Sequence, residues 1–227
     1  MADTEKIPRY LQNEARRLLG AETPIEDDDF AQRTDLLYTR LRSVCTPKSI
    51  YAKTPVTVSG DIIDFGAFSA KSTSLARTLE NCTTAYLMAA TLGAQADRLI
   101  ARTGKESMAD AVIIDAIASA MADAICDNTE VKISEELEKD EYMTMRFSPG
   151  YGDLPLETSS HIITFLDAGR RIGLGTTESY MLVPIKSVTA IIGKSDRPCR
   201  RERSCASCAA SDSCLYRKRG LYCGVHE

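Results

Sequence analysis

The chain opens with two stretches in which apolar and polar positions recur at helical spacing. A first predicted helix stops at Gly20 and carries four apolar residues on one face: Ile7, Leu11, Ala15 and Leu18. A second is expected to begin at Thr23 as the N-cap, with Pro24 in the first helical position and Glu26 completing a capping box. We expect both helices to support the fold rather than to carry chemistry.

Extended and helical patterns then follow one another. β-branched residues over 49–65 favour two strands separated by a turn at Ser59 and Gly60. Three further elements are expected in order: a short helix over 74–80, a buried strand over 83–93 and a helix over 94–104.

The longest predicted helix covers 107–139, and its first half is apolar on nearly every side, as expected for a helix through the middle of a domain. Four carboxylates interrupt that apolar half: Asp110, Asp115, Asp123 and Asp127. A carboxylate near a core needs a donor partner or a ligand. At least one of the four is therefore expected to line a site.

The last third contains a predicted strand over 141–147, a Pro/Gly turn, a short helix over 157–168, and two strands separated by Pro184. Helices and strands do not alternate strictly along the chain, which predicts an α+β fold.

Composition narrows the class of protein. The 227 residues are 44% hydrophobic, which is enough to bury a core. No apolar run approaches the ~20 residues needed to span a bilayer, and the N-terminus lacks the apolar stretch of a signal peptide, so a cytoplasmic location is expected. The net charge of −4 argues against a general nucleic-acid binder.

The turn "RFSPGYGDLP" suggests a binding site. Its glycines permit unusual backbone conformations and its prolines stiffen both sides, which leaves exposed amides. Arg146 adds a planar cationic fork suited to a carboxylate, and Tyr151 adds an aromatic face that can pack on a flat ligand. The structural alternative is an arginine paired to a carboxylate of the domain beside an ordinary turn.

This turn, followed by "TTESYMLVPIKSVTAIIG", resembles the activation domain of cobalamin-dependent methionine synthase. The resemblance is specific over 146–193, weaker back to Met108, and absent from the first 45 residues and the C-terminal tail. It implies an α+β fold with a largely antiparallel sheet. It also implies binding of S-adenosylmethionine and reductive methylation of cob(II)alamin, with an electron from flavodoxin, ferredoxin or a similar donor. Such chemistry needs few acid/base groups, and the chain has only two histidines, His161 and His226.

Residue by residue, the resemblance implies two sets of contacts. Arg146 is expected on the methionyl carboxylate of S-adenosylmethionine, and four other residues are expected at this ligand: Ser148, Gly150, Tyr151 and Asp123. Asp123 replaces a family glutamate and is one methylene shorter; its alternative is a core carboxylate satisfied by a local donor. The expected cobalamin contacts are Tyr151, Thr177, Glu178, Ser179, Met181, Pro184, Ser187 and Val188. For all of these except Tyr151 the alternative is a turn plus a buried strand pair. The chain departs from the family at Leu156-Glu157, where an Asp-His pair is frequent.

No cobalamin, homocysteine or folate domain precedes this region, so the chain is expected to be a free-standing protein acting on a methionine synthase that lacks its own activation domain. The alternatives are a reactivator or methyltransferase for another corrinoid protein and a non-catalytic adaptor that caps one. Three parts are expected: a helical region over 1–46, an activation-domain-like core over 47–196 and a cysteine-rich tail over 197–227.

Five cysteines crowd the tail, and a cytoplasmic chain favours metal ligation over disulfides. The expected thiolate ligands are Cys205, Cys208, Cys214 and Cys223, with Cys199 as a substitute. Zinc would explain how the tail folds, whereas an iron–sulphur cluster would supply an electron. The surrounding arginines and lysines either compensate the thiolate charge or dock an acidic electron donor, with nucleic-acid binding a third, weaker option. Cys45, Cys82 and Cys126 are expected to be core residues.

Overall fold

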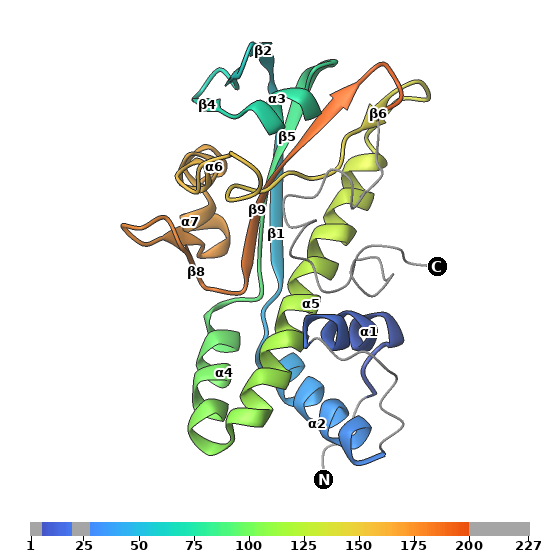
Figure 1. The fold of residues 1–227 in the computed structure, drawn as a ribbon, viewed down its shortest axis with the longest axis vertical. Helices are drawn as coiled ribbons and strands as arrows, with labels where there is room; N and C mark the ends of the chain where they lie inside the picture. The colour runs from blue at the N-terminus through green and yellow to red at the C-terminus, as the bar shows by residue number, and fades with distance from the viewer. Residues whose placement is uncertain (1–5, 20–27, 200–227) are drawn as a thin grey trace.

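An antiparallel sheet of four strands forms the centre of the computed structural model, which describes residues 6–19 and 28–199 (Figure 1). The strands follow the order β1 (Lys48–Pro55), β5 (Cys82–Thr91), β9 (Ser187–Ser195) and β6 (Tyr142–Met143). β5 pairs along its length with β1 on one side and with β9 on the other. This architecture of mixed helices and antiparallel strands is the predicted α+β fold.

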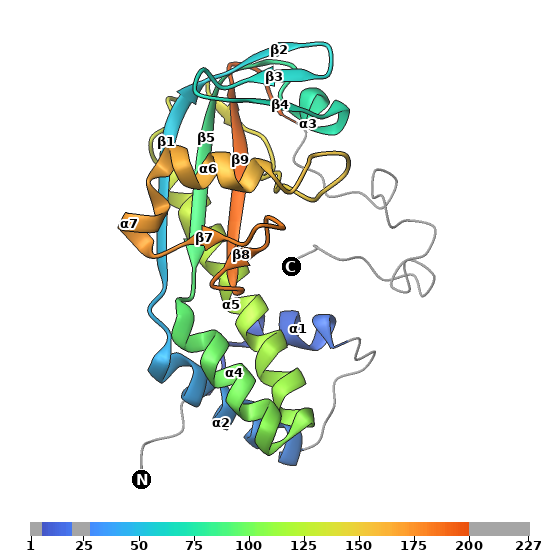
Figure 2. The same ribbon diagram turned by 90° about the vertical axis from the view of Figure 1, so that its left-hand side faces the viewer.

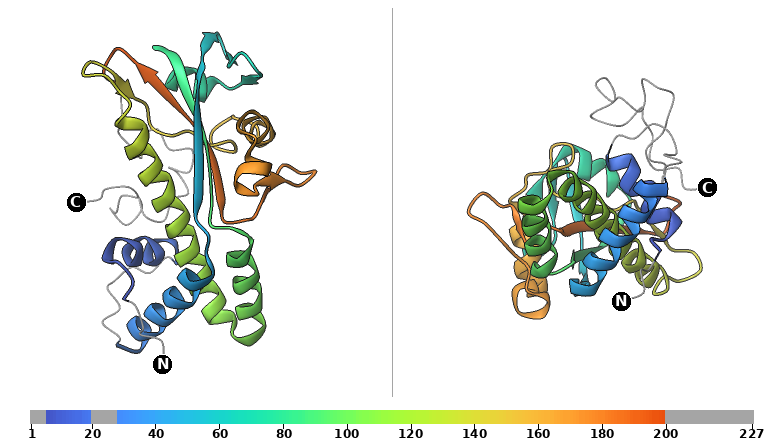
Figure 3. Two further views of the ribbon diagram at one scale, coloured as in Figure 1. Left: turned by 180° about the vertical axis from the view of Figure 1, so that it is seen from behind. Right: turned by 90° about the horizontal axis from the view of Figure 1, so that it is seen from below.

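Helices cover both faces of this sheet, and the alternating side chains of β5 divide between them. Ala85, Leu87 and Ala89 belong to the apolar cluster that includes α6 (Thr158–Leu166) and α7 (Ala168–Ile172). Tyr86, Met88 and Ala90 belong instead to a cluster with Cys126 and Ile133 of α5 (Met108–Ser134). Figure 1 and the view from behind in Figure 3 show α5 on one face and α6 and α7 on the other. A strand buried on both faces is apolar throughout, which explains the unbroken run in β5.

The long helix α5 extends past the sheet into a helical end of the molecule (Figure 2). Ser107 is its N-cap, and the Ser107 hydroxyl accepts a hydrogen bond from the amide of Asp110. The N-terminal part of α5 shares an apolar cluster with α1 (Arg9–Leu18), α2 (Asp28–Val44) and α4 (Ala94–Glu106). The apolar face predicted for the first helix is confirmed at Ile7, Leu11 and Ala15, which are buried, but was wrong at Leu18, which is 43% exposed at the end of the helix. The capping box expected from Thr23 to Glu26 lies outside the described residues.

A small second sheet lies at the opposite end of the molecule (Figure 2). It contains β2 (Thr57–Ser59), β3 (Ile62–Asp64) and β4 (Ser69–Lys71), and α3 (Thr73–Thr78) follows it. The turn predicted at Ser59 and Gly60 is confirmed between β2 and β3, but the prediction of two strands over 49–65 was wrong, because three strands in two sheets occupy this region. Pro55 is the last residue of β1, and the Val56 amide still donates to the Thr83 carbonyl at 3.0 Å before the chain enters the second sheet.

Two other predicted elements are shorter than expected. Only Tyr142–Met143 of the predicted strand 141–147 pairs in the sheet, and an isolated bridge joins Phe147 to Ile191 further along. The predicted helix 157–168 divides into α6 and α7, because Asp167 adopts a left-handed conformation with φ 51°. The two strands predicted on either side of Pro184 are β8 (Leu182–Val183) and β9; β8 pairs with β7 (Gly175–Thr176), a strand that the sequence did not indicate. Among the described residues, none of the helices combines the length and apolar character needed to cross a bilayer.

Candidate functional site

The four aspartates that interrupt the apolar half of α5 each meet a cationic side chain. Asp110 pairs with Arg33 of α2. Asp115 lies 2.9 Å from the ammonium group of Lys186, whose side chain is 12% exposed. Asp123 and Asp127 both contact Arg146. The expectation that these carboxylates need donor partners is confirmed, and two of the four converge on the arginine of the predicted site.

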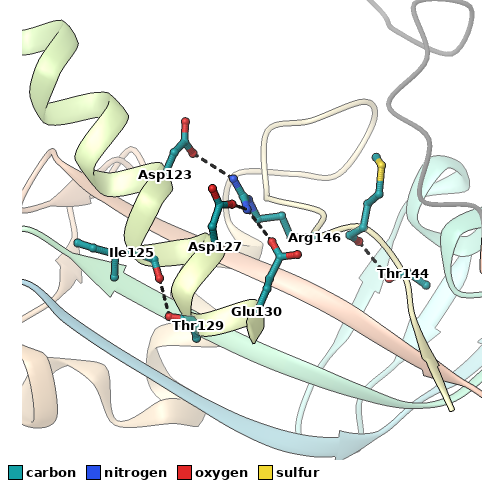
Figure 4. Close-up of polar contacts among 8 residues, drawn as sticks. Asp123, Ile125, Asp127, Thr129, Glu130, Thr144 and Arg146 are labelled. Atoms are coloured by element: carbon teal, nitrogen blue, oxygen red, sulfur yellow. Dashed lines mark hydrogen bonds and ion pairs between the residues drawn. The ribbon is translucent and has the colours of Figure 1, made fainter. Parts of the chain in front are cut away.

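Arg146, Asp123, Asp127 and Glu130 form a compact group that we call the Arg146 cluster (Figure 4). Nη1 of Arg146 donates to Asp127 Oδ1 at 2.5 Å and to Glu130 Oε1 at 2.6 Å, while Nη2 reaches Asp123 Oδ1 at 3.4 Å. The three carboxylates share one face of α5, because positions separated by three and four residues lie above one another on a helix. The guanidinium is therefore paired with carboxylates of the domain, as in the alternative interpretation of the turn given in the sequence analysis.

Burial differs sharply within the Arg146 cluster. The side chains of Arg146 and Glu130 are only 12% and 16% exposed, whereas those of Asp127 and Asp123 are 60% and 45% exposed. Burial alone would lower the pKa of Arg146, but the hydrogen bonds to Asp127 and Glu130 outweigh it and raise the pKa above its usual value. The guanidinium is thus a permanent cation. It lies with Glu130 in the buried part of the cluster, whereas Asp123 and Asp127 face solvent.

The turn that follows Arg146 needs its glycines. Gly150 and Gly152 have φ values of 89° and 54°, a region that favours glycine. The Gly150 amide donates to the carbonyl of Leu154 at 2.8 Å, which closes the turn. A Cβ on Gly152 would lie 2.8 Å from the hydroxyl of Ser74. The side chain of Tyr151 projects from this rigid turn with 70% exposure, so its ring is available as a flat contact surface.

Asp153 ties the far side of the turn to the start of α3. Its carboxylate accepts hydrogen bonds from the hydroxyl of Ser72 at 2.6 Å and from the amides of Thr73 and Ser74 at 2.7 and 3.0 Å. These donors, Ser72 first, hold the pKa of Asp153 well below its usual range. The turn is therefore anchored at one end by Arg146 against α5 and at the other by Asp153 against α3.

The Asp153 anchor predicts a specific pH dependence of stability. A depressed pKa in the folded state contributes stability that is complete above the unfolded pKa of about 3.9 and is lost as pH falls through the folded value. Replacing Asp153→Asn should therefore flatten the rise of unfolding free energy between about pH 2 and pH 5, measured by urea denaturation at several pH values. Replacement of the exposed Asp140→Asn is the control, and an equally flattened curve for Asp140→Asn would contradict the assignment.

The segment predicted to contact the corrin begins with a turn over 177–181. Exposed apolar side chains follow this turn, and we call them the apolar rim. The Thr177 hydroxyl lies 3.0 Å from that of Ser179 and accepts from the Met181 amide at 3.1 Å. Glu178 is exposed in this turn. Three apolar side chains face solvent nearby: Met181, Val183 and Ile185, at 55%, 49% and 68% exposure.

Contacts with α4 and α5 hold the backbone of this apolar rim in place. Asp97 of α4 accepts from the amides of Ile185 at 2.7 Å and Lys186 at 3.4 Å. The Lys186 ammonium reaches Asp115 and the Ser119 hydroxyl on α5, both at 2.9 Å. The segment after Pro184 is thereby attached to two helices, which gives an exposed apolar surface a defined position.

The last two predicted corrin contacts lie within β9. The Ser187 hydroxyl donates to that of Thr91 at 2.8 Å, and Val188 packs, partly buried, against two apolar clusters. Both therefore have the structural role of a strand pair. Ser148, in the turn, accepts a backbone hydrogen bond from Tyr151 at 3.1 Å.

Sequence reasoning missed four residues that shape these surfaces: Asp97, Glu130, Asp153 and Lys186. Asp127 was among the aspartates expected to need a partner, but its pairing with Arg146 was not predicted. The spacing of Asp123, Asp127 and Glu130 was a usable signal, because it places three carboxylates on one helix face. No local pattern pairs Asp97 or Lys186 with its distant partner.

The cysteines divide between the described core and the tail. Cys82 and Cys126 are buried, as predicted, and Cys45 is partly buried; burial raises the pKa of Cys82 and Cys126 to about 12, so both remain thiols. Cys199 is partly exposed, and its thiol lies 3.5 Å from the carbonyl of Arg197. The four principal ligands predicted for the tail metal lie outside the described residues: Cys205, Cys208, Cys214 and Cys223.

Comparison with solved structures agrees with this fold. The chain is similar to the MetH reactivation domain, in a crystal structure bound to AdoHcy, with a TM-score of 0.59 and 14% sequence identity. The match covers 90% of this chain and 79% of that one. No curated protein matches the sequence.

A comparison of the sequence with protein-family models identifies the family of the chain. The model for the vitamin B12 dependent methionine synthase activation domain matches residues 77–200, which include β5, α5, the turn after Arg146 and β9. This match covers more than half of the 227 residues. The protein therefore belongs to the family of vitamin B12-dependent methionine synthase activation domains.

Proposed function

We propose that this protein reactivates a cobalamin-dependent methionine synthase by reductive methylation of cob(II)alamin, with S-adenosylmethionine as methyl donor. The observation that carries the proposal is the rigid turn, which presents a buried guanidinium at its mouth and an exposed tyrosine ring at its tip. A carboxylate and a flat aromatic group, both present in S-adenosylmethionine, match those two features. The related MetH reactivation domain is described as bound to AdoHcy, which is what remains of S-adenosylmethionine after methyl transfer.

Five residues are proposed to bind the methyl donor: Arg146, Ser148, Gly150, Tyr151 and Asp123. In this proposal Arg146 holds the methionyl carboxylate, and Tyr151 packs against the ligand. Asp123 lies 3.4 Å from Arg146 and is 45% exposed, so its carboxylate is near the proposed position of the amino-acid end of the ligand. An anion beside a cationic ligand is a favourable pairing.

The corrin is proposed to be a substrate carried by the partner. Tyr151, the turn of Thr177, Glu178 and Ser179, and Met181 would lie against it. Pro184, which is buried, would support them, as would Ser187 and Val188 of β9. The exposed apolar side chains beside Met181 suit a large planar surface. Their attachment to α4 and α5 through Asp97 and Lys186 supports this role, because a docking surface works best when it is preorganised.

The reaction balances without acid or base catalysis. One electron reduces cob(II)alamin to cob(I)alamin, whose cobalt attacks the methyl carbon of S-adenosylmethionine. The carbon–sulphur bond breaks, its electron pair stays on sulphur, and methylcobalamin and S-adenosylhomocysteine form. No proton is transferred, so the protein has to position two large molecules rather than to supply titrating groups.

The tail is proposed to bind metal through Cys205, Cys208, Cys214 and Cys223, with Cys199 as substitute, as an iron–sulphur cluster or as zinc. A cluster would deliver the electron, and the basic residues around the thiolates would dock flavodoxin or ferredoxin. The division into a helical region over 1–46, a binding core over 47–196 and a metal-binding tail over 197–227 belongs to this proposal. Iron and acid-labile sulphide in anaerobically purified protein would support the cluster, whereas stoichiometric zinc would support a structural tail.

The deciding experiment mixes the protein anaerobically with cob(II)alamin, S-adenosylmethionine and a low-potential reductant, and follows the visible spectrum. Methylcobalamin that forms only when the protein is present would establish the reaction. The assay is then repeated with a cobalamin-loaded methionine synthase as acceptor. No protein-dependent product with either acceptor would reject the proposal and favour a non-catalytic adaptor; product with another corrinoid protein alone would reassign the partner.

A further inference from the structure

The guanidinium proposed to hold the ligand's carboxylate is already engaged by carboxylates of the protein. Asp127 and Glu130 both accept from Nη1 of Arg146, at 2.5 and 2.6 Å, and Asp123 accepts from Nη2 at 3.4 Å. One positive charge thus faces three negative ones. An incoming carboxylate has to share the guanidinium with these groups or replace one of them.

The two carboxylates on Nη1 differ in what it would cost to move them. The Glu130 side chain is 16% exposed, and withdrawing Arg146 from it would leave a carboxylate in a largely buried position. The Asp127 side chain is 60% exposed, so its carboxylate can rotate into water and be rehydrated there. The exposed partner is the one that a ligand can replace.

We propose that Asp127 is a built-in competitor for the carboxylate position on Arg146, displaced when the ligand binds, while Glu130 stays and holds the guanidinium in place. This inference rests on the proposed function, because it concerns the same binding site. Competition lowers apparent affinity by the fraction of protein in which the position is open. It also gives selectivity, since only a ligand that brings its own carboxylate can compensate for the displaced one.

One competing effect determines the choice of probe. S-adenosylmethionine carries a sulphonium cation, so removing a nearby negative charge weakens its binding through long-range attraction. S-adenosylhomocysteine has the same carboxylate and no sulphonium, and 5′-methylthioadenosine lacks both the sulphonium and the amino-acid end. S-adenosylhomocysteine is therefore the primary probe and 5′-methylthioadenosine the reference that does not need the carboxylate position.

The test is calorimetric titration of the full chain with both nucleosides. Asp127→Asn should tighten S-adenosylhomocysteine binding by about 3–10-fold and leave 5′-methylthioadenosine unchanged, as expected from removing a competitor. Glu130→Gln should weaken S-adenosylhomocysteine binding. Asp115→Asn is the matched control, because Asp115 is an α5 carboxylate of similar exposure, 51%, that pairs with Lys186 instead of Arg146.

Each result has one meaning. If the unmodified protein binds S-adenosylhomocysteine and Asp127→Asn does not tighten it, the competitor role is rejected while the proposed ligand stands. Equal tightening by Asp115→Asn would assign the effect to net charge and also reject the role. Tightening by Glu130→Gln as large as that by Asp127→Asn would show that burial does not decide which carboxylate leaves. If the unmodified protein binds neither S-adenosylhomocysteine nor S-adenosylmethionine, the proposed ligand and the inference fail together.

Discussion

Gly193→Ala should destabilise the protein by about 3 kcal/mol, the upper end of what overpacking a core costs. Gly193 lies in β9 at the centre of the sheet, opposite Ala85 of β5. A Cβ there would lie 2.5 Å from both Cys82 Sγ and Leu79 Cδ2, and 3.0 Å from a methyl carbon of Thr144. All three neighbours are buried, so none can move aside without disturbing the core.

Urea denaturation at neutral pH measures this effect as a lower midpoint with an unchanged slope. Gly175→Ala in β7 is the control, because a Cβ on Gly175 meets nothing within 4 Å and the residue has no positive φ. Similar losses for the two variants would show that a general cost of replacing strand glycines, and not the contact with Cys82 and Leu79, is responsible.

Arg146→Ala should weaken S-adenosylmethionine binding by about 1.5–3 kcal/mol, or roughly 10–150-fold, the scale of a charge-assisted contact. The same change removes the cation from between three carboxylates, and Glu130 is the one among them that is largely buried. A loss of stability is therefore expected as well, so binding has to be measured at a temperature at which the variant is folded.

Arg146→Lys separates the two contributions to binding. Lysine keeps the positive charge but cannot offer two parallel donors to a carboxylate, so it should recover stability more fully than affinity. Calorimetric titration and thermal unfolding of the three proteins give both quantities. Unchanged affinity in Arg146→Ala would remove Arg146 from the binding site.

The elements with strong local signals were predicted well from sequence. α5 begins one residue after its capping serine, Ser107, and the apolar run of β5 occupies nearly the predicted range. Strands β2, β3, β4 and β6 have only two or three residues each. An alternation of apolar and polar residues over so short a stretch cannot be distinguished from a loop sequence. Only the structure shows that the chain leaves β1 at Pro55 and then enters a different sheet.

The predicted ligand residues stay a prediction, but the structure shows how two of them lie and which of their partners the sequence did not indicate. Arg146 and Asp123, 23 residues apart, were both predicted at the ligand, and the structure brings them into contact. The engagement of Arg146 by Asp127 and Glu130 could not be inferred, because helix periodicity gives the shared face of the carboxylates but not what that face meets. The same applies to Asp97 and Lys186, whose partners lie on separate elements.

Strand β1 has a consequence for how the protein behaves toward copies of itself. It is an outer strand of the four-stranded sheet, and an outer strand can pair with an edge of another molecule and so begin aggregation. Lys48, Lys53 and Pro55 are exposed along it. Lysines on two molecules would repel each other, and Pro55 offers no donor to a new ladder. The strand that completes the sheet thus also discourages its extension into a second chain.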